Sequence, residues 1–184
     1  MSSHLRRCAI LQYEIGQNVI HPNHGPGEIV DVIEMDLVAG FTNYYVIEFA
    51  RQLTLHIPVR KTDELGLRKT MSKANVADVF ATLRDTPHAL PDDYKARHQQ
   101  IEALLHSGHP VKIAQAVREL AWREKDAGLS KIDGDLFTKG KGMLATEIAL
   151  VTHSDLLEAQ ENINQALTQA ITTKQAQPGL APFQ

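Results

Sequence analysis

Histidines and carboxylates are the residue types in this sequence that could bind a metal ion or transfer a proton. His21, His24 and His56 lie in the N-terminal third of the chain, with Asp31 and Asp36 between them. Their spacing fits no zinc pattern, and the chain holds a single cysteine that could assist them. Structural roles for these histidines are therefore favoured, and the sequence predicts neither a bound metal nor a cofactor.

Pairs of acidic residues are the other candidates for chemistry. The pairs Asp92-Asp93 and Asp133/Asp135 each fall where a helix is expected to begin, and a carboxylate there is explained by the helix dipole. The sequence contains no glycine-rich phosphate loop, no nucleophile elbow and no H-E-x-x-H motif. These observations predict a protein that is not an enzyme.

Charge and composition restrict the partners. The 184-residue chain has a formal net charge of −3, which argues against tight nonspecific binding to nucleic acid. Within residues 94–141, nine Lys/Arg face six Asp/Glu, a local excess that permits a small DNA footprint. One cysteine and the lack of any apolar run of about 20 residues predict a cytoplasmic protein without a membrane association.

The N-terminal part carries the pattern of a small β-structure. Short runs of β-branched and aromatic residues recur between dense turn clusters, at 18–21, 28–37, 44–49 and 53–57, with a hairpin expected near Gln52. Four or five short strands in about 45 residues favour a small barrel, because closure removes exposed strand edges.

After Leu67 the 3.6-residue period of amphipathic helices replaces the strand pattern. Ser72 can cap the first helix and Pro110 can open the third, while Thr152 to Asp155 resembles a capping box for the fifth. Five helices are expected, near 72–84, 92–107, 110–127, 132–151 and 155–172. Gly140 and Gly142 interrupt the fourth, each at a cost of about 1 kcal/mol relative to alanine.

The fold class predicted from these patterns is α+β with two domains, a small N-terminal β-barrel and a C-terminal all-α helical bundle. The expected organisation is a flexible N-terminus (1–12), a β-domain (13–70), a helical domain (71–173) and a disordered tail (174–184).

Several motifs carry a resemblance to one family. Gly16 to Gly27, read as G-Q-N-V-I-H-P-N-H-G-P-G, resembles the opening G-D-x-V-V-Y-P-x-H-G-x-G of the CarD/CdnL family. Tyr45-Val46-Ile47 with Leu53 to Val59 resembles its paired central strands, and Gly66-Leu67-Arg68 its closing G-x-R. In the second half the resemblance continues through Tyr94-Lys95-Ala96, Ser107-Gly108, Ile113 to Leu120, Gly128-Leu129-Ser130 and Glu147 to Leu150.

The resemblance, which spans about residues 15–152, implies a non-catalytic bacterial transcription regulator. The family's Tudor-like β-domain binds a lobe of the RNA polymerase β subunit, partly by sheet-edge pairing. Its helical domain contacts promoter DNA at the upstream edge of the transcription bubble, where a Trp wedge enters the distorted minor groove. Polymerase supplies most of the affinity by tethering a weak DNA-binding module, and a monomer is expected.

Candidate binding residues follow from the aligned positions. The polymerase-facing residues are predicted to be Asp36, Tyr44, Tyr45, His56 and Ile57. The DNA-facing residues are predicted to be Leu90, Tyr94, Lys95, Arg97, Arg123, Lys139 and Lys141. Leu90 occupies the family's Trp wedge position, and its alternative role is a hydrophobic staple on its own helix. Tyr94 could instead pack against a neighbouring helix, and Arg97 could lie on a solvated face.

Two other functions remain open from the sequence. The chain could be an interaction adaptor whose β-domain binds polymerase or another partner and whose helical half does not bind DNA. Asp93, beside the wedge position, replaces a usual Arg of the family and favours this alternative. A small-ligand sensor is a weaker third possibility. Trp122, the only tryptophan, is expected to pack between the modules, and it is the substitute wedge if Leu90 is not exposed.

Overall fold

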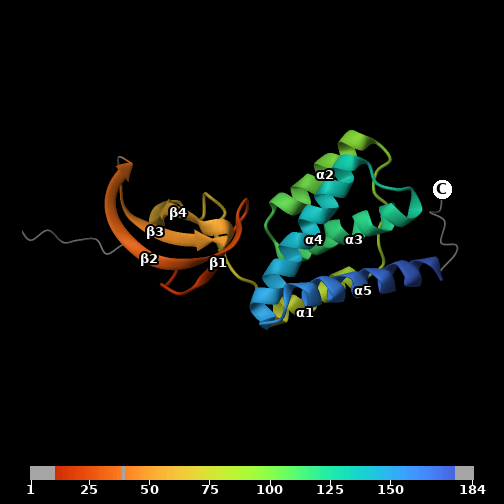
Figure 1. Ribbon diagram of the computed structural model, residues 1–184. Coiled ribbons are helices and arrows are strands. Elements are labelled where there is room, and N and C mark those ends of the chain that lie inside the picture. The colour runs from red at the N-terminus through yellow and green to blue at the C-terminus, as the bar shows by residue number, and fades with distance from the viewer. Residues whose placement is uncertain (1–10, 39, 177–184) are drawn as a thin grey trace, which may run out of the picture. The chain divides into compact units, whose positions relative to one another are not determined.

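The structure, a computed structural model, describes residues 11–38 and 40–176, without the side chains of residues 36–38 and 51. The chain divides into two compact units, residues 1–70 and 71–184 (Figure 1). Each unit is described by itself. The predicted flexible N-terminus and tail fall mostly outside the described residues, although Gln12 accepts a hydrogen bond from Thr62 Oγ1 at 2.9 Å.

The N-terminal unit is one antiparallel sheet with the strand order β4-β3-β2-β1-β5. Its strands are β1 (Asn18–His21), β2 (Gly25–Val38), β3 (Phe41–Phe49), β4 (Leu53–Pro58) and β5 (Arg68–Lys69). Successive strands β1 to β4 pair with their neighbours, so the chain forms a meander, and β5 adds a short edge beside β1. Within the described residues no ladder joins β4 to β5, so closure into a Tudor-like barrel is not seen.

Close contacts fix how the long strand β2 bends past β3. The pairing shifts register between Ile29 and Asp31, the mark of a β-bulge. At Gly27, an added Cβ would lie 2.7 Å from the Phe49 ring and 2.9 Å from the Glu48 carbonyl oxygen. Glycine is therefore required where β2 pairs with Phe49 of β3, because no side chain fits there. On β2, Ile29 belongs to the core of this unit and Val32 packs against it.

The core of the β unit lies on one face of the sheet. Tyr13 is buried although it precedes the first strand: its hydroxyl donates to the Leu67 carbonyl at 2.8 Å, and its backbone N–H donates to Tyr45 Oη at 3.0 Å. The two rings meet edge to face with centroids 5.7 Å apart. The remaining members of this core are Val19, Ile29, Ile47, Phe49, Ile57, Val59 and Leu67.

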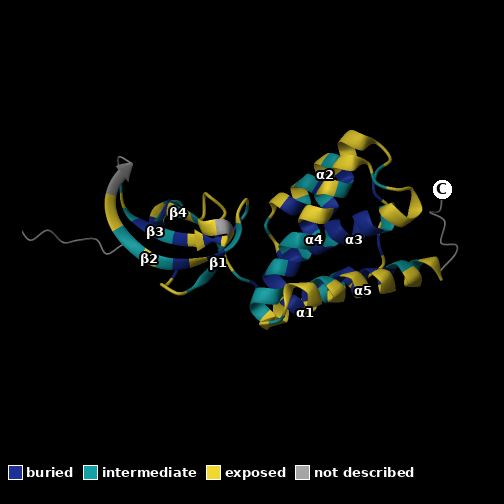
Figure 2. Cartoon of the chain, in the orientation of Figure 1, coloured by how far each residue is buried: buried dark blue, intermediate teal, exposed yellow. Residues whose placement is uncertain are grey.

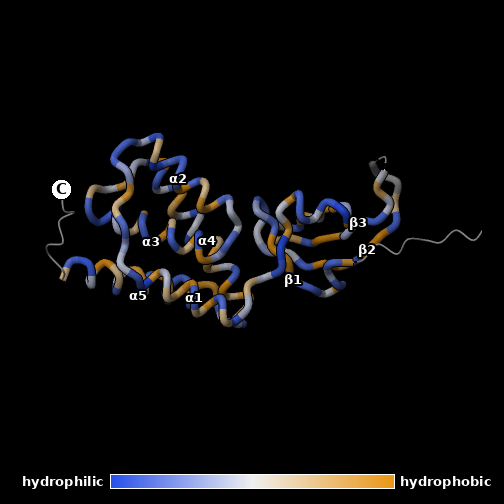
Figure 3. The backbone as a smooth tube through the Cα atoms, turned by 180° about the vertical axis from the view of Figure 1, so that it is seen from behind, coloured by the Kyte–Doolittle hydropathy of each residue, from blue (hydrophilic) through white to orange (hydrophobic). Residues whose placement is uncertain are grey.

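The C-terminal unit contains five helices in its described residues, as predicted. They are α1 (Lys73–Arg84), α2 (Tyr94–His106), α3 (Pro110–Asp126), α4 (Lys131–Thr152) and α5 (Leu156–Gln175). Helix α3 is buried along most of its length, and α1, α2, α4 and α5 all pack against it (Figure 2). The tube of α5 alternates between hydrophobic and hydrophilic colours, as expected of an amphipathic surface helix (Figure 3).

Short polar side chains begin four of these helices. Ser72 and Asn75 form a reciprocal capping box at α1, while Asp93 caps α2 and Ser130 caps α4. The predicted capping box at Thr152 is wrong. Thr152 belongs to the last turn of α4, where its hydroxyl donates to the Ile148 carbonyl, and Asp155 caps α5 by accepting from the Leu157 N–H.

The two glycines inside α4 have different surroundings. An added Cβ at Gly140 would lie 2.8 Å from Val117 Cγ2 and 3.1 Å from Leu105 Cδ2, whereas one at Gly142 would have nothing within 4 Å. Gly140 therefore allows α4 to approach α2 and α3 closely. The sequence predicted a loosened helix at both positions, but at Gly140 the missing side chain is the condition for tight packing.

Candidate functional site

Strand β4 is the exposed edge of the sheet. It pairs with β3 through six consecutive residue pairs, from Tyr44–Pro58 to Phe49–Leu53, with no bulge. No strand among the described residues covers its other side. Its sequence Leu-Thr-Leu-His-Ile-Pro contains no Lys, Arg, Asp or Glu to discourage strand pairing, and its one proline stands at the last position. An even, uncharged edge of this kind is suited to accept an extended segment of another chain.

The five predicted polymerase-facing residues do not form one exposed patch. Tyr44, Tyr45 and Ile57 are buried, with exposed fractions of 1%, 0% and 4%. Tyr45 and Ile57 belong to the core of the β unit, and all three side chains are too buried to be presented to a partner. His56 is exposed on β4, opposite Val46 of β3. The side chain of Asp36 lies outside the described residues.

The β1–β2 turn carries a cluster of aromatic rings. The rings of His21 and His24 lie with centroids 4.7 Å apart and planes tilted by 43°, and both rings contact Phe49. His21 Nδ1 accepts a hydrogen bond from the Asn23 N–H at 3.1 Å. Burial, and secondarily the neighbouring His24, lowers the pKa of His21 below its ordinary value. The structural role favoured for these histidines fits this packing, and the described residues hold no group of three metal-ligating side chains.

In the helical unit, the segment 85–93 between α1 and α2 is fixed by a buried arginine. Arg97 NH1 donates to the carbonyls of Pro91 and Asp92, both at 2.9 Å, and Arg97 Nε donates to Asp133 Oδ2 at 3.2 Å. Arg97 and Asp133 are buried, so this ion pair ties the start of α2 to the start of α4. Phosphate contact by Arg97 would require breaking it.

Leu90, at the predicted wedge position, lies in the same segment. Its exposed fraction is 8%, and it belongs to the hydrophobic core of the helical unit. The placement agrees with a packing role, and the side chain is not presented to DNA in this arrangement. The wedge assignment stays a prediction that burial argues against.

The exposed part of the α2 start consists of Tyr94 and Lys95. Tyr94 is 41% exposed and its ring stacks on His98 at 5.9 Å with an interplanar angle of 12°. Lys95 is exposed. Arg123, from α3, reaches toward the same segment, with NH1 3.8 Å from Asp92 Oδ1. The structure thus places Arg123, a partly exposed cation, beside Asp92, two residues before the exposed ring of Tyr94.

The two lysines of α4 are placed differently from each other. Lys139 is exposed, whereas Lys141 is partly buried with its ammonium 5.1 Å from the Phe137 ring centroid. The contacts of the described residues do not join either lysine to the start of α2. Their contact with DNA stays a prediction.

Sequence reasoning missed a buried polar network around α3. Arg118 and Glu119 are both buried and pair at 2.6 Å. Arg118 also donates to the Thr82 carbonyl at 3.1 Å, and Glu119 accepts from the backbone N–H of His88. Both residues therefore fix the chain between α1 and α2. Arg118 and Glu119 lie away from the apolar stripe of α3, so the sequence did not predict their burial. The stripe predicts one buried face, whereas other helices pack against several faces of α3.

Comparison with known proteins identifies both units. A family model described as the CarD-like/TRCF RID domain matches residues 13–71, and one described as the CarD C-terminal domain matches residues 78–164. The chain belongs to the CarD/CdnL family. It is 22% identical over 142 residues to "Putative transcription factor YdeB" of Bacillus subtilis (strain 168), an alignment that covers 76% of this chain and 92% of that protein.

Family membership makes this chain a transcription regulator with an RNA polymerase-interacting N-terminal domain, as the motifs indicated. CarD proteins are non-enzymatic, which agrees with the absence of catalytic motifs from the sequence. In the part of the chain that the structure describes, no helix has the length and apolar character to cross a membrane.

Proposed function

We propose that this CarD-type chain binds the RNA polymerase β subunit through the β4 edge of residues 13–70, a module of Tudor-like type, and acts on the open promoter complex. The helical unit contacts DNA at the upstream edge of the bubble and modulates the lifetime of the open complex. The observation that carries the proposal is the uncovered, uncharged edge of β4 within the RID-type domain. Backbone pairing along this edge provides affinity, and the exposed His56 contributes to specificity.

The structure changes which DNA contacts are proposed. Leu90 and Arg97 are buried, so the proposed DNA-facing group is Tyr94 with Lys95 at the start of α2, supported by Arg123. An exposed aromatic ring can pack against a distorted base step, and a lysine beside it can bind phosphate. With few cations this contact is weak alone, and polymerase tethering raises its effective concentration.

The polymerase contact is tested with the full chain and purified polymerase β-lobe fragment in a pull-down. His56→Glu places a charge on the β4 edge and is expected to weaken binding. Lys69→Glu is the matched control, because Lys69 is exposed on β5 at the opposite edge of the sheet. If both variants bind as well as the unmodified chain, the assignment of β4 as the polymerase contact is wrong.

The DNA contact is tested in two ways: fluorescence anisotropy on a forked promoter fragment, with and without polymerase, and the lifetime of the polymerase open complex. Lys95→Glu is expected to shorten the open-complex lifetime while leaving polymerase binding intact. Lys73→Glu, at an exposed lysine of the first turn of α1, serves as a control for added negative charge. Unchanged lifetime with Lys95→Glu would disprove the contact at the α2 start.

The adaptor function is the second candidate, and the burial of Leu90 and Arg97 favours it. In that case the β unit binds polymerase or another protein, and the helical unit does not touch DNA. Polymerase binding without any change in DNA anisotropy for the unmodified chain would support the adaptor over the promoter contact.

A further inference from the structure

The end of α5 is attached to the segment that leads into α2. Lys174, in the last turn of α5, donates a hydrogen bond from Nζ to the Pro87 carbonyl at 2.6 Å. The same ammonium lies 4.3 Å from the centroid of the Trp122 ring of α3, a cation–π distance. One partly buried lysine therefore connects α5, α3 and the 85–93 segment.

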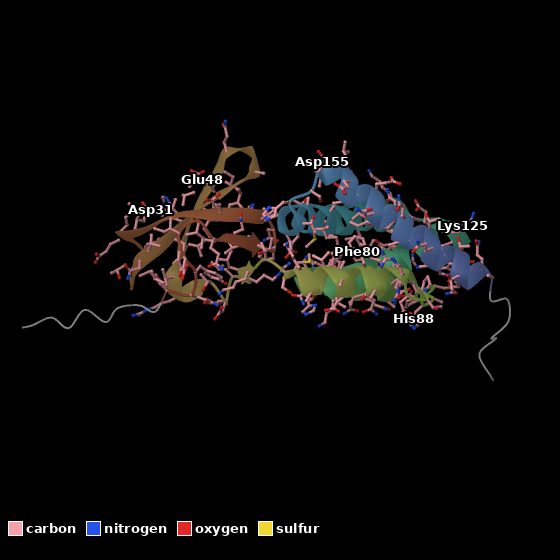
Figure 4. All side chains as sticks on the ribbon, turned by 90° about the horizontal axis from the view of Figure 1, so that it is seen from below. Asp31, Glu48, Phe80, His88, Lys125 and Asp155 are labelled. Carbon is pink, nitrogen blue, oxygen red and sulfur yellow. The ribbon has the colours of Figure 1, made fainter. Side chains whose placement is uncertain are left out.

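This contact completes a series of attachments along the segment. Glu119 of α3 accepts from the His88 N–H one residue after Pro87, and Arg97 of α2 donates to the Pro91 and Asp92 carbonyls. Three helices thus hold successive backbone groups of the segment. Figure 4 shows His88 at the same end of the helical unit as the end of α5. The Asp93 cap and Tyr94 follow directly, so these attachments lead into the start of α2.

Lys174 lies outside the part of the chain matched by the CarD C-terminal domain model, which ends at residue 164. Helix α5 continues to Gln175 and carries Lys174 to Trp122. The attachment is therefore built from an extension of the helix beyond the matched domain, onto the single tryptophan of the chain.

We propose that Lys174 is a positioning residue for promoter contact: it latches the end of α5 to Trp122 and Pro87, and so sets the placement of Tyr94 and Lys95. The inference rests on the proposed DNA contact at the start of α2. Loss of the ammonium removes both a hydrogen bond to a backbone carbonyl and a cation–π contact. The 85–93 segment then gains freedom at Pro87, while Arg97 still holds Pro91 and Asp92.

The test compares Lys174→Met with Lys174→Arg in the full chain. Methionine keeps an unbranched apolar side chain but has no charge and no donor, whereas arginine keeps the cation and the donors. Two readouts are measured: the emission of Trp122, and the lifetime of the polymerase open complex. Lys125→Met is the control, because Lys125 is exposed on α3 three residues after Trp122. Circular dichroism checks that each variant is folded.

Lys174→Met is expected to change Trp122 emission and to shorten the open-complex lifetime about fivefold, a loss typical of one such pair of contacts. Lys174→Arg is expected to restore the lifetime, and Lys125→Met to change neither readout. Unchanged Trp122 emission in Lys174→Met would overturn the latch. Changed emission with an unchanged lifetime, where Lys95→Glu shortens it, would overturn the positioning role alone. An unchanged lifetime in both Lys174→Met and Lys95→Glu would overturn the proposed DNA contact and the positioning role together.

Discussion

Gly140 and Gly142 of α4 allow the steric requirement for close packing of α4 against α2 and α3 to be measured as a free energy of unfolding. Alanine in place of glycine in a helix interior stabilises the helix by about 1 kcal/mol. At Gly142 the new methyl group meets no atom within 4 Å, so Gly142→Ala is expected to stabilise the helical unit by roughly that amount.

Gly140→Ala makes the same change two residues earlier, where the methyl group would lie 2.8 Å from Val117 Cγ2 and 3.1 Å from Leu105 Cδ2. Both neighbours are buried core side chains with little room to move. Overpacking of this kind costs about 1–3 kcal/mol. The helix-propensity gain is common to both variants, so the difference between them, about 1–3 kcal/mol in favour of Gly142→Ala, is the steric cost alone.

Urea unfolding followed by circular dichroism at the helix band measures both variants against the unmodified chain. The comparison requires that the free energy of unfolding falls with urea concentration at the same slope in every variant. A changed slope would report a change in the unfolded or native state rather than in stability. Gly140→Ala as stable as Gly142→Ala, or more stable, would refute the argument that α4 packs through Gly140.

Further predictions concern the buried ion pair, the β1–β2 turn and the corrected helix cap. Arg97→Met should destabilise the helical unit by about 3–5 kcal/mol in urea unfolding, because it leaves the Asp133 carboxylate buried without its partner; a loss under 1 kcal/mol would contradict this. The lowered pKa of His21 means that the folded β unit favours the neutral ring. The stability that the neutral His21 ring contributes is full above about pH 6.5 and is lost as the pH falls through the folded pKa. An NMR titration that gives the ring a pKa of 6.5 or higher would disprove this contribution. Asp155→Ala should lower the free energy of unfolding by about 1 kcal/mol through loss of the α5 cap, and Thr152→Ala should lower it clearly less. The reverse order in thermal unfolding would support the capping box at Thr152.

Local patterns predicted the elements of this fold well. The β-branched runs located β1 to β4, and the helical period located five helices, because both signals arise from which residues must face a core. The two-residue strand β5 was not predicted, since a pairing with β1 so short leaves no period in the sequence. Thr152 was misassigned because the helix before it runs one residue further than its apolar run suggests, and either Thr or Asp can cap.

The candidate site was harder to predict, because sequence patterns indicate residue type but not enclosure. Arg97 was read as a surface cation, and its burial depends on Asp133, 36 positions away. The Lys174–Trp122 contact likewise joins residues that no local pattern relates. The alignment of Leu90 with the family's Trp indicated a position in the chain, while packing decided that the side chain there points into the core.

Hydrogen exchange of the full chain with and without RNA polymerase tests the central claim most directly. A partner strand added to β4 would engage backbone groups of residues 53–58 that face away from β3. The proposal predicts that polymerase slows amide exchange within residues 53–57, since Pro58 has no N–H, with little change at β5 on the opposite edge. Protection at β5 or in the helical unit, with 53–58 unchanged, would contradict the assignment of β4 as the polymerase-binding edge.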